Sequence, residues 1–237
     1  RIEDPYEGVI RNDIDTTSFC GIKEIDLSIN DTMYNDTSTN YRKLLFEEYT
    51  GHTCGNCPKF TKKLVEKVEN DLSEKSVMVS IHAGPFAALD EKYTTDFTTD
   101  EGNELLNRFK VNSYPGLIVN RANKPISGTL WDGFIDSLKT SGVFDEPLFK
   151  FNLMSVYNPP TRKGQLYVET TILKDMQNTN LVVGLIIVED KVVAKQTDYS
   201  QTPEDVPDYE HRFVLRNYET SVFGSSLIQG DISANKK

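Results

Sequence analysis

Cys54 and Cys57 form a Cys-Gly-Asn-Cys motif, in which two residues separate the thiols. The motif follows the apolar run 44–46 and precedes an amphipathic pattern that begins at Pro58 and predicts a helix. The start of a helix directs unpaired backbone N–H groups and a partial positive charge at the residues before it. This field favours a thiolate over a thiol, so the pair is suited to thiol–disulfide exchange. We expect Cys54 to be the more exposed and attacking sulfur, and Cys57 to resolve the mixed disulfide.

A Cys-x-x-Cys pair has a second interpretation, because half of a zinc site has the same spacing. His52 and Cys20 are the residues that could complete such a site. Structural zinc usually takes two pairs of ligands, and the sequence shows one pair, so we predict neither a metal nor a cofactor. Cys20 stands between Phe19 and Ile22 and is predicted to be a small buried hydrophobic residue.

A tyrosine–proline pair, Tyr114-Pro115, lies between a predicted helix at 103–110 and an apolar strand at 117–119. In this order of elements the chain resembles the thioredoxin superfamily, in which a cis-proline lies against the active-site cysteines. The resemblance implies that the Tyr114–Pro115 bond is cis and that Pro115 shapes the substrate groove. The bulk of Tyr114 would narrow that groove for an extended peptide. The additional segment 82–100 is polar and aromatic, and we expect it to shape or cover the site.

Three other polar side chains are candidates for the site. Glu48 lies six positions before Cys54, where thioredoxins carry a buried acid that relays a proton to the resolving cysteine. Glu47 is the competing residue, and the alternative is a solvated carboxylate at a strand end. His52 precedes Cys54 by two positions, where an imidazolium would favour the thiolate; the alternative is that it only fills a loop. His82 ends a strand predicted to be parallel and central, a usual place for sites in α/β sheets, or it is a satisfied histidine at a domain edge.

Composition limits the classes of partner and the domain count. The chain has 237 residues, which favours two domains, and 38% hydrophobic residues, which suffice for their cores. The net charge of −10 argues against nucleic acid as a partner, because neutralising phosphates requires clustered Lys and Arg. The longest apolar run, 181–188, is too short to span a bilayer and is predicted to be a buried strand.

The hydrophobic period changes along the chain and predicts three regions, α/β followed by all-β. Residues 1–40 read as an N-terminal arm with a strand or hairpin at 19–29. Residues 41–145 alternate strands with helices, as expected of a thioredoxin-like domain. Residues 146–237 read as an antiparallel, immunoglobulin-like β-sandwich domain. Its predicted strands are 148–157, 165–173, 181–188, 191–196, 209–216 and 221–228.

With both halves considered, the chain resembles the twenty-eight-kilodalton outer-membrane-protein family of bacterial envelope lipoproteins. The segments that carry the resemblance are 47–58, which includes Tyr-Thr-Gly-His and Cys-x-x-Cys-Pro, then 81–84, 96–104 and 211–216. The resemblance implies a thioredoxin-like domain before a β-sandwich that continues beyond Lys237. It also implies an outer-membrane lipoprotein facing the periplasm or the cell surface, anchored through a lipidated cysteine upstream of Arg1.

Two functions of different classes follow from these patterns. The first is thiol–disulfide exchange on protein thiols or disulfides of the envelope, with Cys54 attacking, Cys57 resolving, Pro115 shaping the groove and Glu48 moving the proton. The second is a non-enzymatic binding protein with a structural disulfide and a ligand-binding β-sandwich. A structural disulfide predicts a couple below about −300 mV and little exchange with dithiols. The sequence leaves the choice between enzyme and binding protein open.

Overall fold

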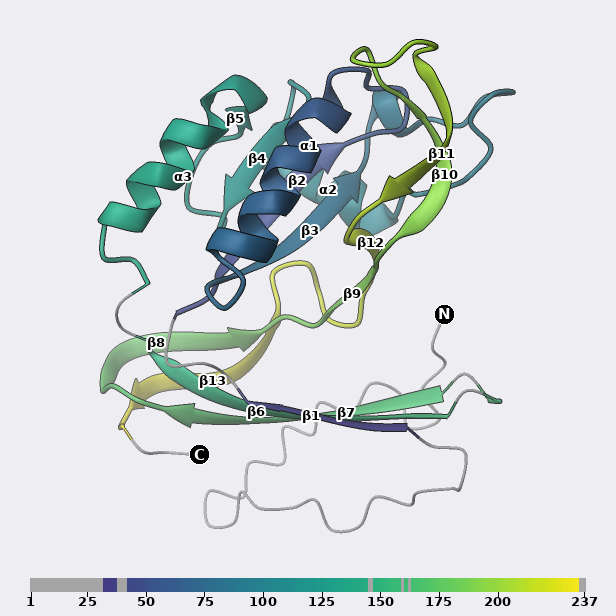
Figure 1. The fold of residues 1–237 in the computed structure, drawn as a ribbon. Coiled ribbons are helices and arrows are strands. Elements are labelled where there is room, and N and C mark those ends of the chain that lie inside the picture. Colours follow the sequence, from purple (N-terminus) through teal and green to yellow (C-terminus); the bar gives the residue numbers. More distant parts are fainter. Residues whose placement is uncertain (1–31, 38–41, 145–146, 159, 162, 235–237) are drawn as a thin grey trace. The chain divides into compact units, whose positions relative to one another are not determined.

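A computed structural model describes residues 32–37, 42–144, 147–158, 160–161 and 163–234 (Figure 1). The chain divides into two compact units. We call residues 43–145 together with 184–224 the cysteine unit, and residues 1–42, 146–183 and 225–237 the strand unit. The predicted boundary near residue 146 therefore does not separate two continuous domains. Residues 184–224 belong with the first half of the chain, because β12 (Val214–Tyr218) joins its central sheet.

The cysteine unit is a mixed α/β structure around a six-stranded sheet of order β5-β4-β2-β3-β12-β9. Both β2 and β12 run parallel to β3, and the other neighbours are antiparallel. His82 ends β3 at the centre of this sheet, as predicted. The other strand bounds are β2 (Leu44–Thr50), β3 (Ser76–His82), β4 (Gly116–Val119), β5 (Ile126–Ser127) and β9 (Ile186–Glu189).

Helices cover both faces of the sheet. On one face α1 (Cys57–Glu66), which continues as a π-helical turn at Lys67–Asp71, packs with α3 (Trp131–Thr140) over Leu44 and Phe46 of β2. On the other face α2 (Asp100–Phe109) packs over Tyr49. Because successive residues of a strand point to opposite faces, β2 places Glu48 on the α1 side and Glu47 on the α2 side. Short 3-10 turns occupy Pro85–Ala87 and Gly128–Leu130.

A hairpin of β10 (Val192–Thr197) and β11 (Asp205–His211) forms a separate two-stranded sheet in the cysteine unit. Ala194 of β10 packs against Phe97 and against Val214 of β12. The hairpin is thereby attached to the side of the central sheet where β3 ends.

Two predicted strands are wrong in extent. The apolar run 181–188 is divided at Gly184: β8 (Met176–Val183) pairs with β13, whereas β9 pairs with β12. Neither part is a fully buried strand, since Val182 and Val188 are exposed. The predicted strand 209–216 is likewise interrupted, because Phe213 has a φ of 50° between the end of β11 and the start of β12.

The described residues of the strand unit form two small antiparallel sheets. One has the order β1-β6-β7, and the other pairs β8 with β13. Cys20 and the predicted strand at 19–29 lie outside the described residues. No helix in the described part of the chain is long and apolar enough to cross a membrane. The bounds not yet given are β1 (Thr32–Thr37), β6 (Phe149–Asn158), β7 (Lys163–Ile172) and β13 (Ser225–Ile232).

Candidate functional site

Cys54 and Cys57 form a disulfide at the N-terminus of α1, with 5.4 Å between their Cα atoms. Cys57 is the first residue of the helix, and Pro58 follows it at a position where no backbone N–H is needed. The Cys57 N–H donates to the Cys54 carbonyl at 3.0 Å and closes the loop between the two residues. The disulfide thus lies in the positive field of the helix start, as expected.

Both cysteines are buried, and Cys54 is the more exposed of the two by a small margin. The exposed fraction is 4% for Cys54 and 1% for Cys57. The tip of the β10–β11 hairpin, which comes from a distant part of the sequence, binds the loop that carries them. The sequence did not predict this contact, because Gln196 of the hairpin lies 142 positions after Cys54.

Residues 196–199 of this hairpin, which we call the cap segment, bind the loop that carries the cysteines. The Thr197 N–H donates to the His52 carbonyl at 2.9 Å, and the Tyr199 N–H donates to the Gly55 carbonyl at 2.9 Å. The side-chain Nε2 of Gln196 donates to the Cys54 carbonyl at 3.2 Å. Three carbonyls of the cysteine loop are therefore occupied by the cap segment.

The side chain of Tyr199 lies directly on Gly55. A Cβ atom at position 55 would come within 2.4 Å of the Tyr199 ring, so only glycine allows this approach. Asp198, next to Tyr199 in the chain, is buried and forms an ion pair with Lys62 of α1, with 3.4 Å between Oδ2 of Asp198 and Nζ of Lys62. Gly55, between the cysteines, thus has a packing role that the motif alone does not reveal.

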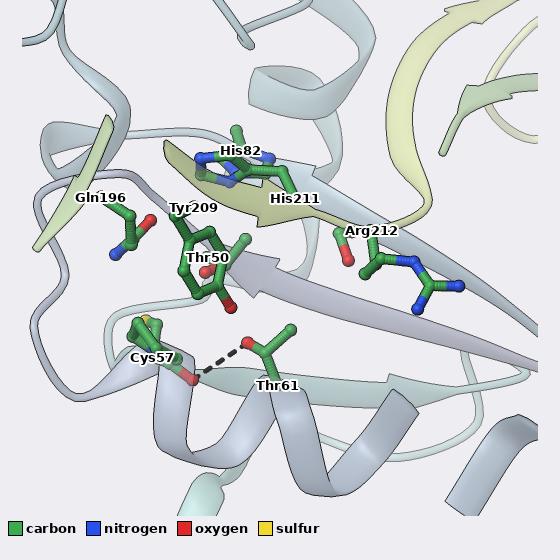
Figure 2. A pocket seen from close by; sticks show the side chains of 10 residues that line it. Thr50, Cys57, Thr61, His82, Gln196, Tyr209, His211 and Arg212 are labelled. Atoms are coloured by element: carbon green, nitrogen blue, oxygen red, sulfur yellow. Dashed lines mark hydrogen bonds between the residues drawn. The ribbon is translucent and has the colours of Figure 1, made fainter. Parts of the chain in front are cut away.

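Glu48 is fully buried beneath the first turn of α1. The Thr61 hydroxyl donates a short hydrogen bond to its Oε1, and the Ser80 hydroxyl donates to its Oε2 at 3.1 Å. The same Thr61 oxygen lies 3.0 Å from the carbonyl of Cys57 (Figure 2). Burial raises the pKa of Glu48 from 4.5 to about 7, against the opposing effect of the two hydroxyls. The carboxyl is therefore a proton donor or acceptor near neutral pH, linked through Thr61 to the helix turn of Cys57.

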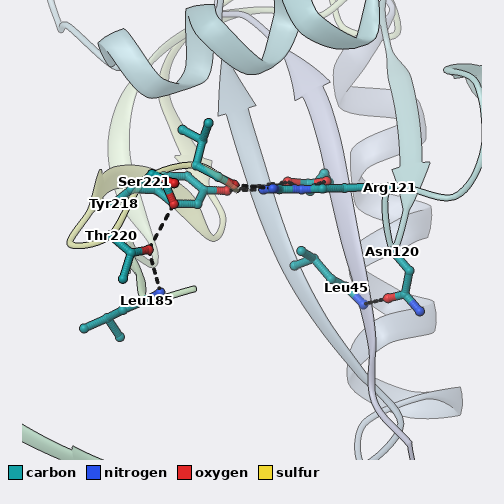
Figure 3. A network of polar contacts seen from close by, with 9 residues as sticks. Leu45, Asn120, Arg121, Leu185, Tyr218, Thr220 and Ser221 are labelled. Atoms are coloured by element: carbon teal, nitrogen blue, oxygen red, sulfur yellow. Dashed lines mark hydrogen bonds and ion pairs between the residues drawn. The ribbon is translucent and has the colours of Figure 1, made fainter. Parts of the chain in front are cut away.

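Glu47 is buried on the opposite face and has a different set of partners. Nη2 of Arg121 lies 2.8 Å from Oε1 of Glu47 and also donates to the Tyr218 hydroxyl at 2.8 Å (Figure 3). Arg121 also donates to the carbonyl of Val222. Glu47 is paired with Arg121 on the α2 side and does not compete with Glu48 on the α1 side.

All three histidines of the chain lie around Phe97. Ring centroids of His82 and His211 lie 4.7 and 4.5 Å from that of Phe97, and the centroid of His52 lies at 6.2 Å. His52 stacks on Tyr93, and its Nε2 lies 2.9 Å from the carbonyl of Ala88. These contacts tie His52 to the segment 82–100, which was expected to shape the site.

His82 and His211 form a buried pair, with 3.3 Å between Nε2 of His82 and Nδ1 of His211. Burial lowers the pKa of His211 to about 4 and that of His82 well below its usual value; the neighbouring histidines add to both shifts. Both rings are therefore neutral at pH 7. Within the described part of the chain, Nδ1 of His82 and Nε2 of His211 have no hydrogen-bond partner.

A small cavity of about 10 Å³ connects these groups (Figure 2). This volume is about that of one water molecule, and the polar lining offers it hydrogen bonds. The described residues contain no group of three or more His, Cys, Asp or Glu placed to hold a metal ion. The lining includes Cys57, Thr61, Ser80, His82, Tyr209 and His211.

Pro115 is buried at the same end of the sheet as the cysteine loop. The bond between Tyr114 and Pro115 is cis, and the next residue, Gly116, pairs with Tyr49 near the end of β2. The Tyr114 hydroxyl donates to the carbonyl of Ala83 at 2.9 Å, and burial raises the pKa of Tyr114 to about 12. Tyr114 is thus fixed to the segment that follows His82.

Comparison with known proteins supports the family resemblance. The family model of outer membrane protein Omp28 matches residues 102–237, more than half of the chain. The chain belongs to the Omp28 family. The matched region starts after the Cys-x-x-Cys motif, so membership in the Omp28 family rests on the second half of the chain. The predicted resemblance to this outer-membrane family is confirmed.

Among solved structures, the chain is similar to HBP35 of Porphyromonas gingivalis, with a TM-score of 0.47 and 9% sequence identity. The similarity covers 84% of this chain and 67% of that one. No curated protein gives a significant match to the sequence.

Proposed function

We propose that this Omp28-family chain catalyses thiol–disulfide exchange in the bacterial envelope, through a thioredoxin-like cysteine unit. The observation that carries the proposal is the position of Glu48, a buried acid with a pKa near 7, beneath the helix turn that begins at Cys57. A purely structural disulfide needs no titrating acid beside it. A resolving thiolate does, because it must gain a proton when the disulfide opens.

The reaction balances with a client dithiol as the reductant. A client thiolate attacks Sγ of Cys54, the bond between Cys54 and Cys57 breaks, and a mixed disulfide forms. Cys57 leaves as a thiolate and takes a proton that originates from the Glu48 carboxyl. The second client thiol then gives its proton back to the Glu48 carboxylate and displaces Cys54. Cys54 leaves as a thiolate and takes from solvent the proton that the first client thiol released, so that the client becomes a disulfide and the pair becomes two thiols. The reverse sequence reduces a client disulfide.

The clients, the membrane anchor and the fold of the strand unit are proposed from membership in the Omp28 family. We propose that the clients are protein thiols or disulfides of the envelope, that a lipid anchor holds the chain to the outer membrane on its periplasmic or surface side, and that the strand unit belongs to a β-sandwich. Pro115 would line the client groove, since the strand register places it beside the end of β2. His52 would act by holding the cysteine loop in place.

The test is reduction of a protein disulfide, for example that of insulin, by the reduced chain and by three variants. Cys54→Ser and Cys57→Ser should each abolish turnover. Cys20→Ser is the matched control, because it removes a thiol outside the motif, and its rate should equal that of the unchanged protein. Equal rates for Cys54→Ser and the unchanged chain would contradict the proposed activity.

A second function is favoured by one observation, the burial of both cysteines in a loop that the cap segment binds. In that case the disulfide is structural, and the chain acts by binding a protein or glycan. A redox titration separates the two, because a structural disulfide predicts a potential below about −300 mV, whereas an exchanging couple predicts a higher one.

A further inference from the structure

The cap segment binds the cysteine loop through main-chain hydrogen bonds. The two N–H groups that reach the loop belong to Thr197 and Tyr199, two positions apart. In an extended chain, groups at positions i and i+2 lie on the same edge, which is how a docked peptide strand uses its main chain. Main-chain pairing of this kind requires no particular side chain from the segment that supplies it.

We infer that the cap segment occupies the place of the client, and that the client is an extended polypeptide segment which replaces it. This inference rests on the proposed exchange activity. Two main-chain N–H groups of the client would take over the carbonyls of His52 and Gly55 that Thr197 and Tyr199 now occupy. Its thiolate would then reach Sγ of Cys54, which is buried while the cap segment is in place.

The tip of the cap is attached more weakly than its base. Tyr199 is 59% exposed, and the ion pair from Lys62 to Asp198 comes from a side chain that is 53% exposed and therefore screened by solvent. At the base, Gln196 is buried and donates to carbonyls of the cysteine loop, and Ala194 is part of a buried cluster. The tip can therefore open while the base of the hairpin stays packed.

The tip also has internal bonds that preserve its shape when it moves. The Asp198 N–H donates to the carbonyl of Glu204 at 2.7 Å, and the Gln201 N–H donates to the carbonyl of Asp198 at 3.0 Å. Oδ1 of Asp198 accepts the N–H of Ser200 at 3.0 Å. Because these bonds lie within the tip, a client competes with the contacts that the cap segment makes outside the hairpin. Those contacts are with the cysteine loop, with α1 and with Tyr93, whose hydroxyl is hydrogen-bonded to Oγ1 of Thr197.

The experiment measures how fast the oxidised full chain is reduced by three probes: a dithiol peptide of extended conformation, dithiothreitol and a small phosphine. Tyr199→Ala and Lys62→Gln each remove one contact of the tip. The matched control is Val193→Ala, since Val193 lies on the same hairpin and is exposed, away from the cysteine loop. Hydrogen exchange of the Thr197 and Tyr199 amides reports opening of the tip in each protein.

We expect Tyr199→Ala to raise the rate with the peptide about tenfold, the effect of losing roughly one good contact, and to speed exchange of both amides. Lys62→Gln should raise the rate less, and Val193→Ala should leave it unchanged. Equal peptide rates in all four proteins, with intact exchange activity, would overturn the inference alone. Faster phosphine reduction in both tip variants, with no exchange on the peptide by any protein, would instead overturn the proposed function and with it this client.

Discussion

Glu47 and Glu48 show how neighbouring residues of one type acquire different chemistry. Both are fully buried on β2, but they point to opposite faces of the sheet. Glu47 meets the guanidinium of Arg121 and forms a buried ion pair with it. Glu48 meets two hydroxyls and no cation among the described residues, so burial favours its neutral form. Position within the strand, and not residue type, decides which carboxyl can carry a proton at pH 7.

The raised pKa of Glu48 predicts a pH dependence of stability. Folding raises its pKa from 4.5 to about 7, so its contribution is full below pH 4.5 and is lost as the pH rises through 7. Through Glu48 alone, the free energy of unfolding is therefore lower above pH 7 than below pH 4.5 by roughly 3 kcal/mol. Glu48→Gln keeps the shape and removes the titration. We therefore expect the unfolding free energy of the variant, measured with urea, to fall less between pH 4.5 and pH 8.

The comparison between proteins isolates Glu48, because His82 and His211 titrate in both of them. Glu91→Gln is the control, since Glu91 is an exposed carboxylate of the same unit, and its pH profile should match that of the unchanged chain. A Glu48→Gln profile parallel to the unchanged one would show that Glu48 does not hold a proton near neutral pH. Slower insulin reduction by the same variant would connect that proton to exchange.

At the scale of single residues, the sequence predicted those site residues that lie near the motif in the chain or at positions that match the resemblance to thioredoxins. Cys54, Cys57 and Glu48 belong to one strand–loop–helix segment. The helix pattern indicated the place of the cysteines, and the thioredoxin resemblance indicated Glu48, with Glu47 as the alternative. Tyr199 and His211 were not predicted, because contacts across such a distance in sequence leave no local pattern. The one signal present was the segment 211–216, which carried the family resemblance but was not read as part of the site.

At the scale of elements, Arg121 connects three strands of the cysteine unit. It follows β4, forms the ion pair with Glu47 of β2, and donates to the Tyr218 hydroxyl at the end of β12. Since β12 comes from a distant part of the chain, this network fastens residues 184–224 to the first half (Figure 3). Its partner Glu47 is inaccessible to water, so the ion pair cannot be replaced by solvation.

Arg121→Met should destabilise the chain by about 3–5 kcal/mol, because it leaves the Glu47 carboxylate buried without its cation. Urea unfolding at pH 7 measures this loss. The double variant Glu47→Leu, Arg121→Met should recover most of it, since two apolar side chains replace a buried ion pair at little net expense. A single-variant loss below about 1 kcal/mol would show that the pair is solvated in solution.

The helices were predicted more closely than the later strands, for a physical reason. The pattern from Phe60 to Leu72 specifies one face over more than three turns, and α1 with its π-helical extension follows it. A run such as 181–188 has no period, so it does not reveal the interruption at Gly184. Which strand pairs with which is decided by tertiary contacts, and the placement of β12 beside β3 was therefore missed.

At the scale of the whole molecule, the chain contributes two separate stretches to the cysteine unit and three to the strand unit. The changes of composition and hydrophobic period along the chain predicted continuous domains. Both quantities are local, so they do not show that a later stretch returns to an earlier unit. The family match from residue 102 to 237 includes residues of both units.

The two units should differ in local stability. Hydrophobic residues of the cysteine unit such as Phe46, Ile81 and Leu215 are almost completely buried. The buried hydrophobic residues among the described part of the strand unit are few: Val156, Ile172 and Ile232. Because local opening is limited mainly by buried apolar contacts, amides of β6, β7 and β13 should exchange on the order of 100-fold faster than those of β2 and β3. Hydrogen exchange of the intact chain, followed peptide by peptide, measures both sets in one sample. Equal protection would mean that the exposed side chains of the strand unit are covered in solution and that the chain unfolds as a single cooperative structure.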